Sequence, residues 1–273
     1  MTKKNESQTE DEYDTLPVKS LKAMSKNRSF VFYGRSGTGK TTLALTFPGK
    51  ILILDIKDRG TDSGADIDED TAMGMSVESW DDFEMVYYYL LKHPKEYKTV
   101  IIDTMSQLQQ LCVEKVLKDK KKSTARAGDW GTLTKQDWGT VASLMKQWII
   151  SYRDLPMEVV FIAQDRTFNV DEEASDSEAQ LSPEIGPRLS PSVAAHLNAA
   201  VSVVGNTFIR EKTKIKEVNG KKKEITEKQY CLRIGPNSVY VTKMRKPKSI
   251  QLPDILIDPD YDYIIETLTG KKD

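Results

Sequence analysis

An eight-residue phosphate-binding motif constrains this 273-residue chain more than any other feature. Residues 34–41 read GRSGTGKT and fit the pattern G-x-x-x-x-G-K-[ST]. The apolar, β-prone segment 30–33 before the motif favours a strand, and segment 42–47 after it favours a short amphipathic helix. This strand-loop-helix context argues against a merely decorative glycine turn. The sequence therefore predicts a binding site for a nucleoside triphosphate, ATP.

Each residue type in the motif has a role in holding phosphates. Glycines let successive backbone N–H groups curl around the β-phosphate, and the positive end of the next helix faces the same anion. We expect Lys40 to reach the β- and γ-phosphates and Thr41 to offer its hydroxyl to Mg²⁺. The predicted ATP-binding residues are Gly34, Arg35, Ser36, Gly37, Thr38, Gly39, Lys40, Thr41 and Thr42.

Composition narrows the class of protein. With 38% hydrophobic and 30% charged residues, the chain suits one large α/β domain. A net charge of −1 means that any nucleic-acid contact needs local basic patches. The two cysteines, Cys112 and Cys231, lack metal or disulfide-framework spacing. No apolar run approaches the roughly 20 residues of a membrane span, and the start lacks a secretory signal, so we expect no membrane partner and a cytoplasmic location.

Strand-like and helix-like segments alternate along the chain. Continuous apolar runs favour strands buried on both faces of a parallel sheet, and amphipathic segments lie between them. This order predicts a doubly wound, mostly parallel sheet with ligand at the carboxyl ends of its strands. We expect a flexible arm over residues 1–15 and a single domain over 16–273, with a β-hairpin extension at about 207–245. The predicted strands include 51–55, 99–103 and 158–164, and the predicted helices include 106–117, 137–152 and those starting at Ser79 and Ser190.

Asp103 occupies the place of a Mg²⁺-directing acid. It ends the apolar strand 99–103, downstream of the phosphate-binding loop. The next residue is Thr104, whereas ATPases of the AAA+ helicase-loader type usually carry a second acid there. Thr41 and Asp103 are therefore the predicted Mg²⁺ ligands.

The order of these motifs resembles the RecA-like ATPase core, and most closely the compact phage-encoded RecA-like proteins of single-strand annealing and recombination. The resemblance covers about residues 16–268 and rests on segments 34–42, 51–55, 100–103 and 162–164. It implies a RecA-like P-loop NTPase fold in which Gln164 senses the γ-phosphate and relays ATP state to a DNA-contacting loop. It also implies single-stranded DNA as a partner, a single-strand-binding protein as a further one, and the bacterial host cytoplasm if the chain is phage-encoded.

Two departures from the RecA-like pattern bear on activity. Lys57 stands where a water-orienting glutamate is usual, so we expect Asp55 or Asp58 to substitute, with slow hydrolysis. The segment 166–187, where RecA-like proteins have a DNA-binding loop, is acidic, which weighs against strand exchange.

Segment 239–245 is predicted to be a strand, in which the side chains of Lys243 and Arg245 lie on the same face. It resembles the RecA-like element that sends a cation pair across a subunit boundary onto the neighbour's γ-phosphate. This reading implies a ring or filament with ATP at the subunit interface. A solvated basic strand end is the open alternative.

Basic clusters supply candidate DNA contacts. One cluster, less interrupted by acidic residues than the next, lies between two predicted helices. Its Trp130 offers a stacking surface. A second cluster surrounds Asn219-Gly220, a dipeptide typical of a tight hairpin, but glutamates interrupt it. The predicted DNA-binding residues are Lys120, Lys121, Lys122 and Arg126.

Together these features favour an ATP-hydrolysing, DNA-stimulated protein that assembles on single-stranded DNA for recombination or annealing. A P-loop kinase acting on a small molecule or nucleotide is the first alternative, although no arginine-rich lid is evident. A non-hydrolysing, ATP-gated adaptor of replication proteins is the second.

Overall fold

The computed structural model describes residues 27–57, 64–123, 133–168, 183–218 and 221–270. Its helices are α2 (Lys40–Ala44), α3 (Trp80–Lys92), α4 (Met105–Ser123), α5 (Lys135–Arg153), α6 (Pro191–Ala200) and α7 (Tyr261–Thr269). Its strands are β1 (Ser29–Tyr33), β2 (Ile51–Asp55), β3 (Ala72–Ser76), β4 (Thr99–Asp103), β5 (Glu158–Ala163), β6 (Asp165–Phe168), β7 (Glu184–Pro187), β8 (Val203–Val218), β9 (Lys221–Arg233), β10 (Lys243–Met244) and β11 (Ile255–Ile257).

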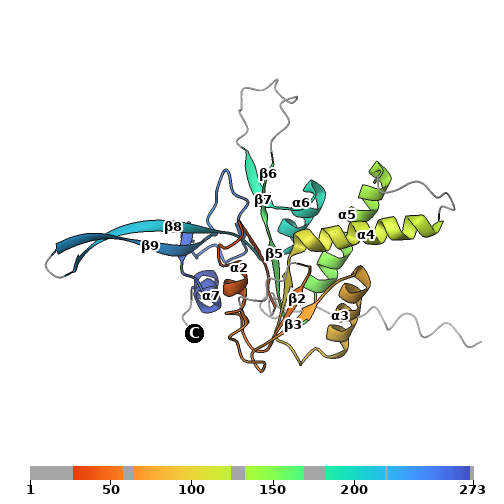
Figure 1. Cartoon of the computed structure of the whole chain (residues 1–273), viewed down its shortest axis with the longest axis horizontal. Helices are drawn as coiled ribbons and strands as arrows, with labels where there is room; N and C mark the ends of the chain where they lie inside the picture. Colours follow the sequence, from red (N-terminus) through yellow and green to blue (C-terminus); the bar gives the residue numbers. More distant parts are fainter. Residues whose placement is uncertain (1–26, 58–63, 124–132, 169–182, 219–220, 271–273) are drawn as a thin grey trace, which may run out of the picture.

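Within the described part of the chain, nine strands form one sheet in the order β11-β9-β8-β1-β5-β4-β2-β3, with β10 paired to β8 (Figure 1). The six strands from β8 to β3 are parallel, and β9, β10 and β11 are added antiparallel. β1, β2, β4 and β5 are buried along their whole length, as expected for parallel strands covered on both faces. The predicted doubly wound, mostly parallel sheet is confirmed.

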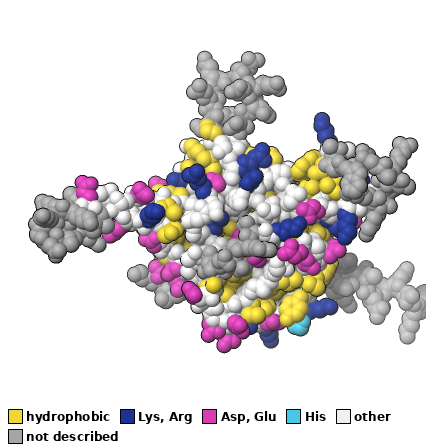
Figure 2. Space-filling view, viewed as in Figure 1, with side chains coloured by type: hydrophobic (Ala, Val, Ile, Leu, Met, Phe, Trp, Pro, Cys, Tyr) yellow, Lys and Arg dark blue, Asp and Glu magenta, His cyan; other side chains and the backbone are white. Residues whose placement is uncertain are grey.

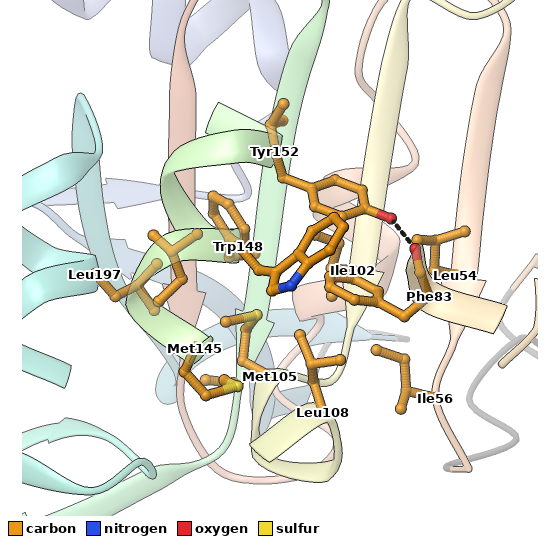
Figure 3. Close-up of a cluster of buried hydrophobic side chains, with 14 of the residues drawn as sticks. Leu54, Ile56, Phe83, Ile102, Met105, Leu108, Met145, Trp148, Tyr152 and Leu197 are labelled. Carbon is orange, nitrogen blue, oxygen red and sulfur yellow. Dashed lines mark hydrogen bonds between the residues drawn. The ribbon is translucent and has the colours of Figure 1, made fainter. Parts of the chain in front are cut away.

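Two hydrophobic clusters cover the two faces of the sheet. The larger contains side chains of α3, α4, α5 and α6, and the smaller contains those of α2 and α7. Figure 3 shows part of the larger cluster, where the rings of Phe83 and Tyr152 stack at 4.5 Å and Trp148 packs edge-on to Phe83. The Tyr152 hydroxyl donates a 2.8 Å hydrogen bond to the Phe83 carbonyl, so this buried polar group is satisfied. The apolar stripe of α3 is therefore core.

The predicted helix starts at Ser79 and Ser190 differ in their capping hydrogen bonds. Ser79 forms a capping box with Asp82 at the start of α3, because each side chain bonds the other's backbone N–H. Ser190 precedes Pro191 at the start of α6, but its hydroxyl makes no capping hydrogen bond, and its N–H donates instead to Gln109 Oε1 at 2.8 Å.

The predicted strand 239–245 is wrong in extent, since only β10, two residues long, is a strand there. Asn237 Oδ1 accepts hydrogen bonds from the N–H groups of Val239 and Tyr240, which turns the chain. The following backbone pairs with Ile185 before it reaches β10. The turn that the Asn237 side chain forms therefore directs the first half of segment 239–245 toward β7.

The ribbon of β8 and β9 extends away from the body of the molecule (Figure 1). Its 13 register pairs run from Asn206–Arg233 to Val218–Lys221, flanking the predicted hairpin dipeptide. Residues 203–206 of β8 also pair with β1, so one strand passes from the central sheet into the ribbon. We call residues 207–218 and 221–232 the arm.

Among the described helices, none combines the length and apolarity that crossing a bilayer requires.

Candidate nucleotide-binding site

The phosphate-binding loop, residues 34–41, leaves the buried end of β1 and turns into α2. Gly34 lies so close to β8 that a Cβ atom there would stand 2.3 Å from the Thr207 carbonyl oxygen. Gly39 has φ 83°, a left-handed conformation at the N-cap of α2. Both positions therefore require glycine, one for space and the other for backbone conformation.

Lys40 and Thr41, predicted to bind phosphate and Mg²⁺, are the first two residues of α2. Lys40 is buried, and its Nζ donates to the carbonyl oxygens of Gly34 at 2.9 Å and Arg35 at 2.8 Å. Thr41 Oγ1 donates a 2.8 Å hydrogen bond to Asp103 Oδ2. The two predicted metal ligands are thus in direct contact, and their hydroxyl and carboxylate oxygens are the hard donors that suit Mg²⁺ beside phosphate oxygens.

Strand register explains this meeting. β5 lies between β1 and β4, and it pairs Tyr33 with Ala163 on one side and Ile162 with Asp103 on the other. The carboxyl ends of the three strands therefore stand level at one edge of the sheet. Gln164 follows β5 directly, between the phosphate-binding loop and Asp103.

A cavity of about 630 Å³ opens in front of the loop. This volume falls in the range of ligand sites. Its walls contain loop residues together with Asp103, Thr104 and Gln164. They also contain residues that the sequence did not mark, including Thr207, Tyr230, Asp258 and Pro259.

Tyr230 and Asp258 form the outer wall of this cavity. The half-exposed Tyr230 ring comes 3.1 Å from the position that a Cβ on Gly39 would occupy. Asp258 holds Tyr230 through two hydrogen bonds: Tyr230 N donates to Oδ1 at 2.9 Å, and Asp258 N donates to the Tyr230 carbonyl at 2.6 Å. The wall is therefore an aromatic side chain whose backbone is held by the adjacent Asp258.

Thr207 joins the arm to the phosphate-binding loop. Its Oγ1 lies 2.7 Å from Thr38 Oγ1, in hydrogen-bond contact, and Thr38 also donates to the Arg35 carbonyl at 2.8 Å. The loop is thus braced by the first residue of the arm.

Of the two residues predicted to activate water, the structure describes only Asp55. Asp55 ends β2, pairs in register with Asp103 and is buried, but it is not among the residues that line the cavity. Lys57 Nζ forms a 2.9 Å ion pair with Glu114 Oε2 on α4. Asp58 lies outside the described residues. The assignment of Asp55 or Asp58 stays a prediction.

Gln164 lines the nucleotide cavity and also a second, smaller one. Its Oε1 accepts a 2.9 Å hydrogen bond from Arg188 Nη1, and its carbonyl accepts one from Arg188 N at 2.7 Å. The second cavity, of about 300 Å³, has polar walls without a carboxylate among its described residues, which are Ser106, Gln107, Gln109, Gln110, Gln164, Arg166, Arg188 and Leu189.

Lys243 and Arg245 do lie on one side of their segment, but they contact their own chain. Lys243 Nζ donates to the carbonyl oxygens of Asn198 at 2.8 Å and Ala199 at 2.7 Å, and Arg245 Nη2 donates to Ala199 at 2.7 Å. Both cations thus cap the carboxyl end of α6, where the helix dipole favours positive charge. Burial, and secondly the Arg245 charge, lower the pKa of Lys243 to about 8. Their action on a neighbouring subunit stays a prediction.

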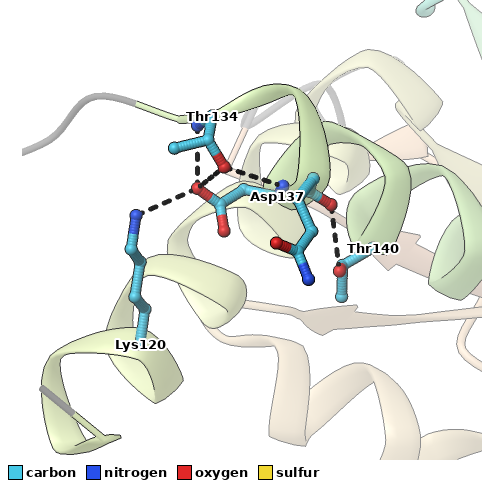
Figure 4. A network of polar contacts seen from close by, with 5 residues as sticks. Lys120, Thr134, Asp137 and Thr140 are labelled. Carbon is cyan, nitrogen blue, oxygen red and sulfur yellow. Dashed lines mark hydrogen bonds and ion pairs between the residues drawn. The ribbon is translucent and has the colours of Figure 1, made fainter.

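Lys120, predicted to contact DNA, forms an ion pair with Asp137 at 3.1 Å (Figure 4). The Asp137 carboxylate also accepts hydrogen bonds from Thr134 N and Oγ1, both at 2.8 Å. These Thr134 contacts first, and then Lys120, lower the pKa of Asp137. Lys120 therefore ties the end of α4 to the start of α5, and Arg126, Trp130 and the side chains of Lys121 and Lys122 lie outside the part of the chain that is described.

The buried β1, the glycine-rich loop, Lys40 and the Thr41–Asp103 pair define a P-loop NTPase domain of the α/β class. A family model described as AAA domain matches residues 26–246, so the chain belongs to the AAA domain family. No curated protein matches the sequence. Among solved structures, the chain is similar to the KaiC-like protein PH0186 from Pyrococcus horikoshii OT3, with 11% identity and a TM-score of 0.42 over 85% of this chain and 89% of that one. It is also similar to the RadB recombinase, with 13% identity and a TM-score of 0.36 over 74% and 86%.

Proposed function

We propose that the chain is a RecA-like, Mg²⁺-dependent ATPase that assembles on single-stranded DNA for recombination or annealing. The observation that carries this proposal is the position of Gln164, which borders both the nucleotide cavity and the polar cavity containing Arg166 and Arg188. A residue in that position can report the state of the γ-phosphate to a neighbouring anion-binding surface.

At the phosphate end, the chain supplies positive charge and metal ligands. Lys40 exchanges its contacts with two loop carbonyls for the β- and γ-phosphate oxygens, where its charge stabilises the transferring group. Thr41 and Asp103 would hold Mg²⁺, which would neutralise charge that develops on the phosphates. Glycine N–H groups of the loop surround the β-phosphate.

At the outer end, Tyr230 provides the surface on which the adenine base stacks. Its ring lies next to Gly39, so a nucleotide whose phosphates occupy the loop reaches it within the same cavity. Asp258 keeps the Tyr230 backbone in place and presents a hydrogen-bond acceptor to the nucleoside.

The polar cavity supports a DNA contact beside the sensor. Arginine guanidinium groups bind phosphates through two parallel hydrogen bonds, and Arg188 is already aligned by Gln164. If the γ-phosphate draws the Gln164 side chain, Arg188 loses this partner and becomes available to a DNA phosphate. ATP binding would then stabilise the assembly and hydrolysis would release it.

The test combines ATP turnover with molar mass by light scattering, with and without single-stranded DNA. We expect DNA to stimulate turnover and increase mass in the intact chain, and Lys40→Ala to lose both. Lys92→Ala, which removes an exposed lysine at the end of α3, is the control and should behave like the intact chain. No DNA response and a constant mass would overturn the proposal, and turnover that needs a phosphate acceptor would identify a kinase.

One observation favours the adaptor alternative. Lys57, at the usual glutamate position, is engaged by Glu114 on α4 and supplies no base for water. Nucleotide binding and DNA-dependent assembly without any turnover would identify an ATP-gated adaptor.

A further inference from the structure

The arm concentrates positive charge in a chain that is nearly neutral overall. Residues 207–218 and 221–232 contain eight lysines and arginines and four glutamates, a net charge of +4 against −1 for the whole chain. The rest of the chain is therefore acidic on balance. Figure 2 shows that the described part of the arm carries both dark blue and magenta side chains where it leaves the body.

The ladder register separates these charges into two sets. Alternate pairs of a two-stranded ladder belong to opposite faces. Pairs 210–229, 212–227, 214–225, 216–223 and 218–221 form one set, which we call the basic set, and the pairs between them form the mixed set. The basic set contains Arg210, Lys212, Lys214, Lys216, Lys221 and Lys223 with one acid, Glu227; the mixed set contains Lys222 and Lys228 with Glu211, Glu217 and Glu224.

The described positions of the two sets also differ in apolar content. In the basic set, Arg210 donates from Nε and Nη2 to Gln229 Oε1 at 3.2 and 2.9 Å, and Lys212 is exposed opposite Glu227. The next pair toward the body, Ile209–Tyr230, continues the alternation of the mixed set, and both of its side chains are exposed and hydrophobic. A protein interface needs an apolar centre, whereas the described basic positions Arg210, Lys212, Glu227 and Gln229 are all polar; Val218 and Ile225 belong to the basic set by register, nearer the turn between the two strands.

We propose that the basic set of the arm binds the sugar-phosphate backbone of single-stranded nucleic acid. Cations at every second residue stand about 7 Å apart along each strand. Successive cations can therefore meet different phosphates without reading bases, which gives sequence-independent binding. This inference rests on the proposed function and assigns its nucleic-acid contact to a surface outside the sheet.

The root of the arm links this surface to the nucleotide. Thr207 contacts Thr38, and Tyr230 packs beside Gly39. The strands that carry the basic set therefore also wall the ATP cavity. Nucleic acid on the arm is expected to change nucleotide affinity through these two contacts.

The test uses two charge-exchange variants that keep composition and net charge. Glu211→Lys/Lys212→Glu moves one cation from the basic set to the mixed set. Lys212→Glu/Glu227→Lys exchanges the partners of one register pair and leaves the charge of the basic set unchanged. The dissociation constant for a labelled oligo-dT is measured across a range of NaCl concentrations, and circular dichroism checks that both variants are folded.

We expect the first variant to bind oligo-dT several-fold more weakly and to lower the slope of log Kd against log salt by about 0.7, the value for one released cation on a single strand. The second variant should match the intact chain. If the intact chain and both variants bind oligo-dT equally, or if both variants are weakened equally, the assignment of nucleic-acid binding to the basic set is overturned. The DNA response of the intact chain would still uphold the proposed function. Absence of oligo-dT binding by the intact chain would overturn both, and a change of mass without DNA binding would point instead to a second copy of the chain.

Discussion

Replacing Tyr230 with alanine is expected to weaken ATP binding by about 5- to 30-fold. Stacking of a base on an aromatic side chain contributes about 1–3 kcal/mol. Tyr230 is 46% exposed, so its ring can cover one face of the base and leave the other open. The lower part of that range, about 1–2 kcal/mol, therefore applies, and each 1.4 kcal/mol is about tenfold in Kd.

Two comparisons separate base stacking from support of the phosphate-binding loop. Tyr230→Phe keeps the ring, and we expect its Kd for ATP to stay within about twofold of the intact chain. Inorganic tripolyphosphate occupies only the phosphate end of the cavity, so its Kd should not change in Tyr230→Ala.

Isothermal titration calorimetry with Mg²⁺ present measures both ligands on the three proteins. Equal weakening of ATP and tripolyphosphate in Tyr230→Ala would refute the stacking assignment, because it would show that the ring acts by packing beside Gly39. An unchanged Kd for both ligands would place the base elsewhere.

Three further outcomes follow from individual groups. Thr41→Val removes the hydroxyl that contacts Asp103 and should abolish the Mg²⁺ dependence of ATP affinity, measured by titration with and without the metal. Burial raises the pKa of Glu158 to about 7, so the folded state holds a proton between pH 4.5 and 7 that the unfolded state releases. The free energy of unfolding should therefore fall by roughly 2–3 kcal/mol as pH rises through that interval, and urea denaturation of Glu158→Gln should show no such fall. Burial lowers the pKa of Lys243 from 10.5 to about 8, so between these two pH values the unfolded state holds a proton that the folded state releases. The free energy of unfolding should therefore rise with pH over that interval, and urea denaturation of Lys243→Arg, whose side chain stays charged, should show no such rise.

The phosphate end of the site could be predicted from sequence because its determinants are local. The loop is contiguous, and its glycines are fixed by the turn from β1 into α2. Asp103 was recognisable because it ends a five-residue strand that is buried along its whole length and has three apolar residues at its centre. Parallel register then brings it to Thr41 without any further signal.

The outer wall of the cavity could not be predicted in the same way. Tyr230 reaches Gly39 only because β9 pairs with β8 and β11 pairs with β9, which sets Ile257 opposite Cys231. Neither pairing leaves a spacing pattern around Asp258. The Gln164–Arg188 contact spans only 24 residues, but it forms because the chain returns through β7 beside β6.

Chain order makes the nucleotide cavity a late product of protein synthesis. The phosphate-binding loop is translated early, whereas Tyr230 and Asp258 come near the end of the described chain. β1 itself gains its two neighbours only when β5 and β8 have been made. At about 5–20 residues per second, roughly 10–40 s separate the loop from its wall. A nascent chain on the ribosome therefore carries the motif long before it has a complete pocket, and ATP can stabilise the fold only once nearly all of these strands are in place.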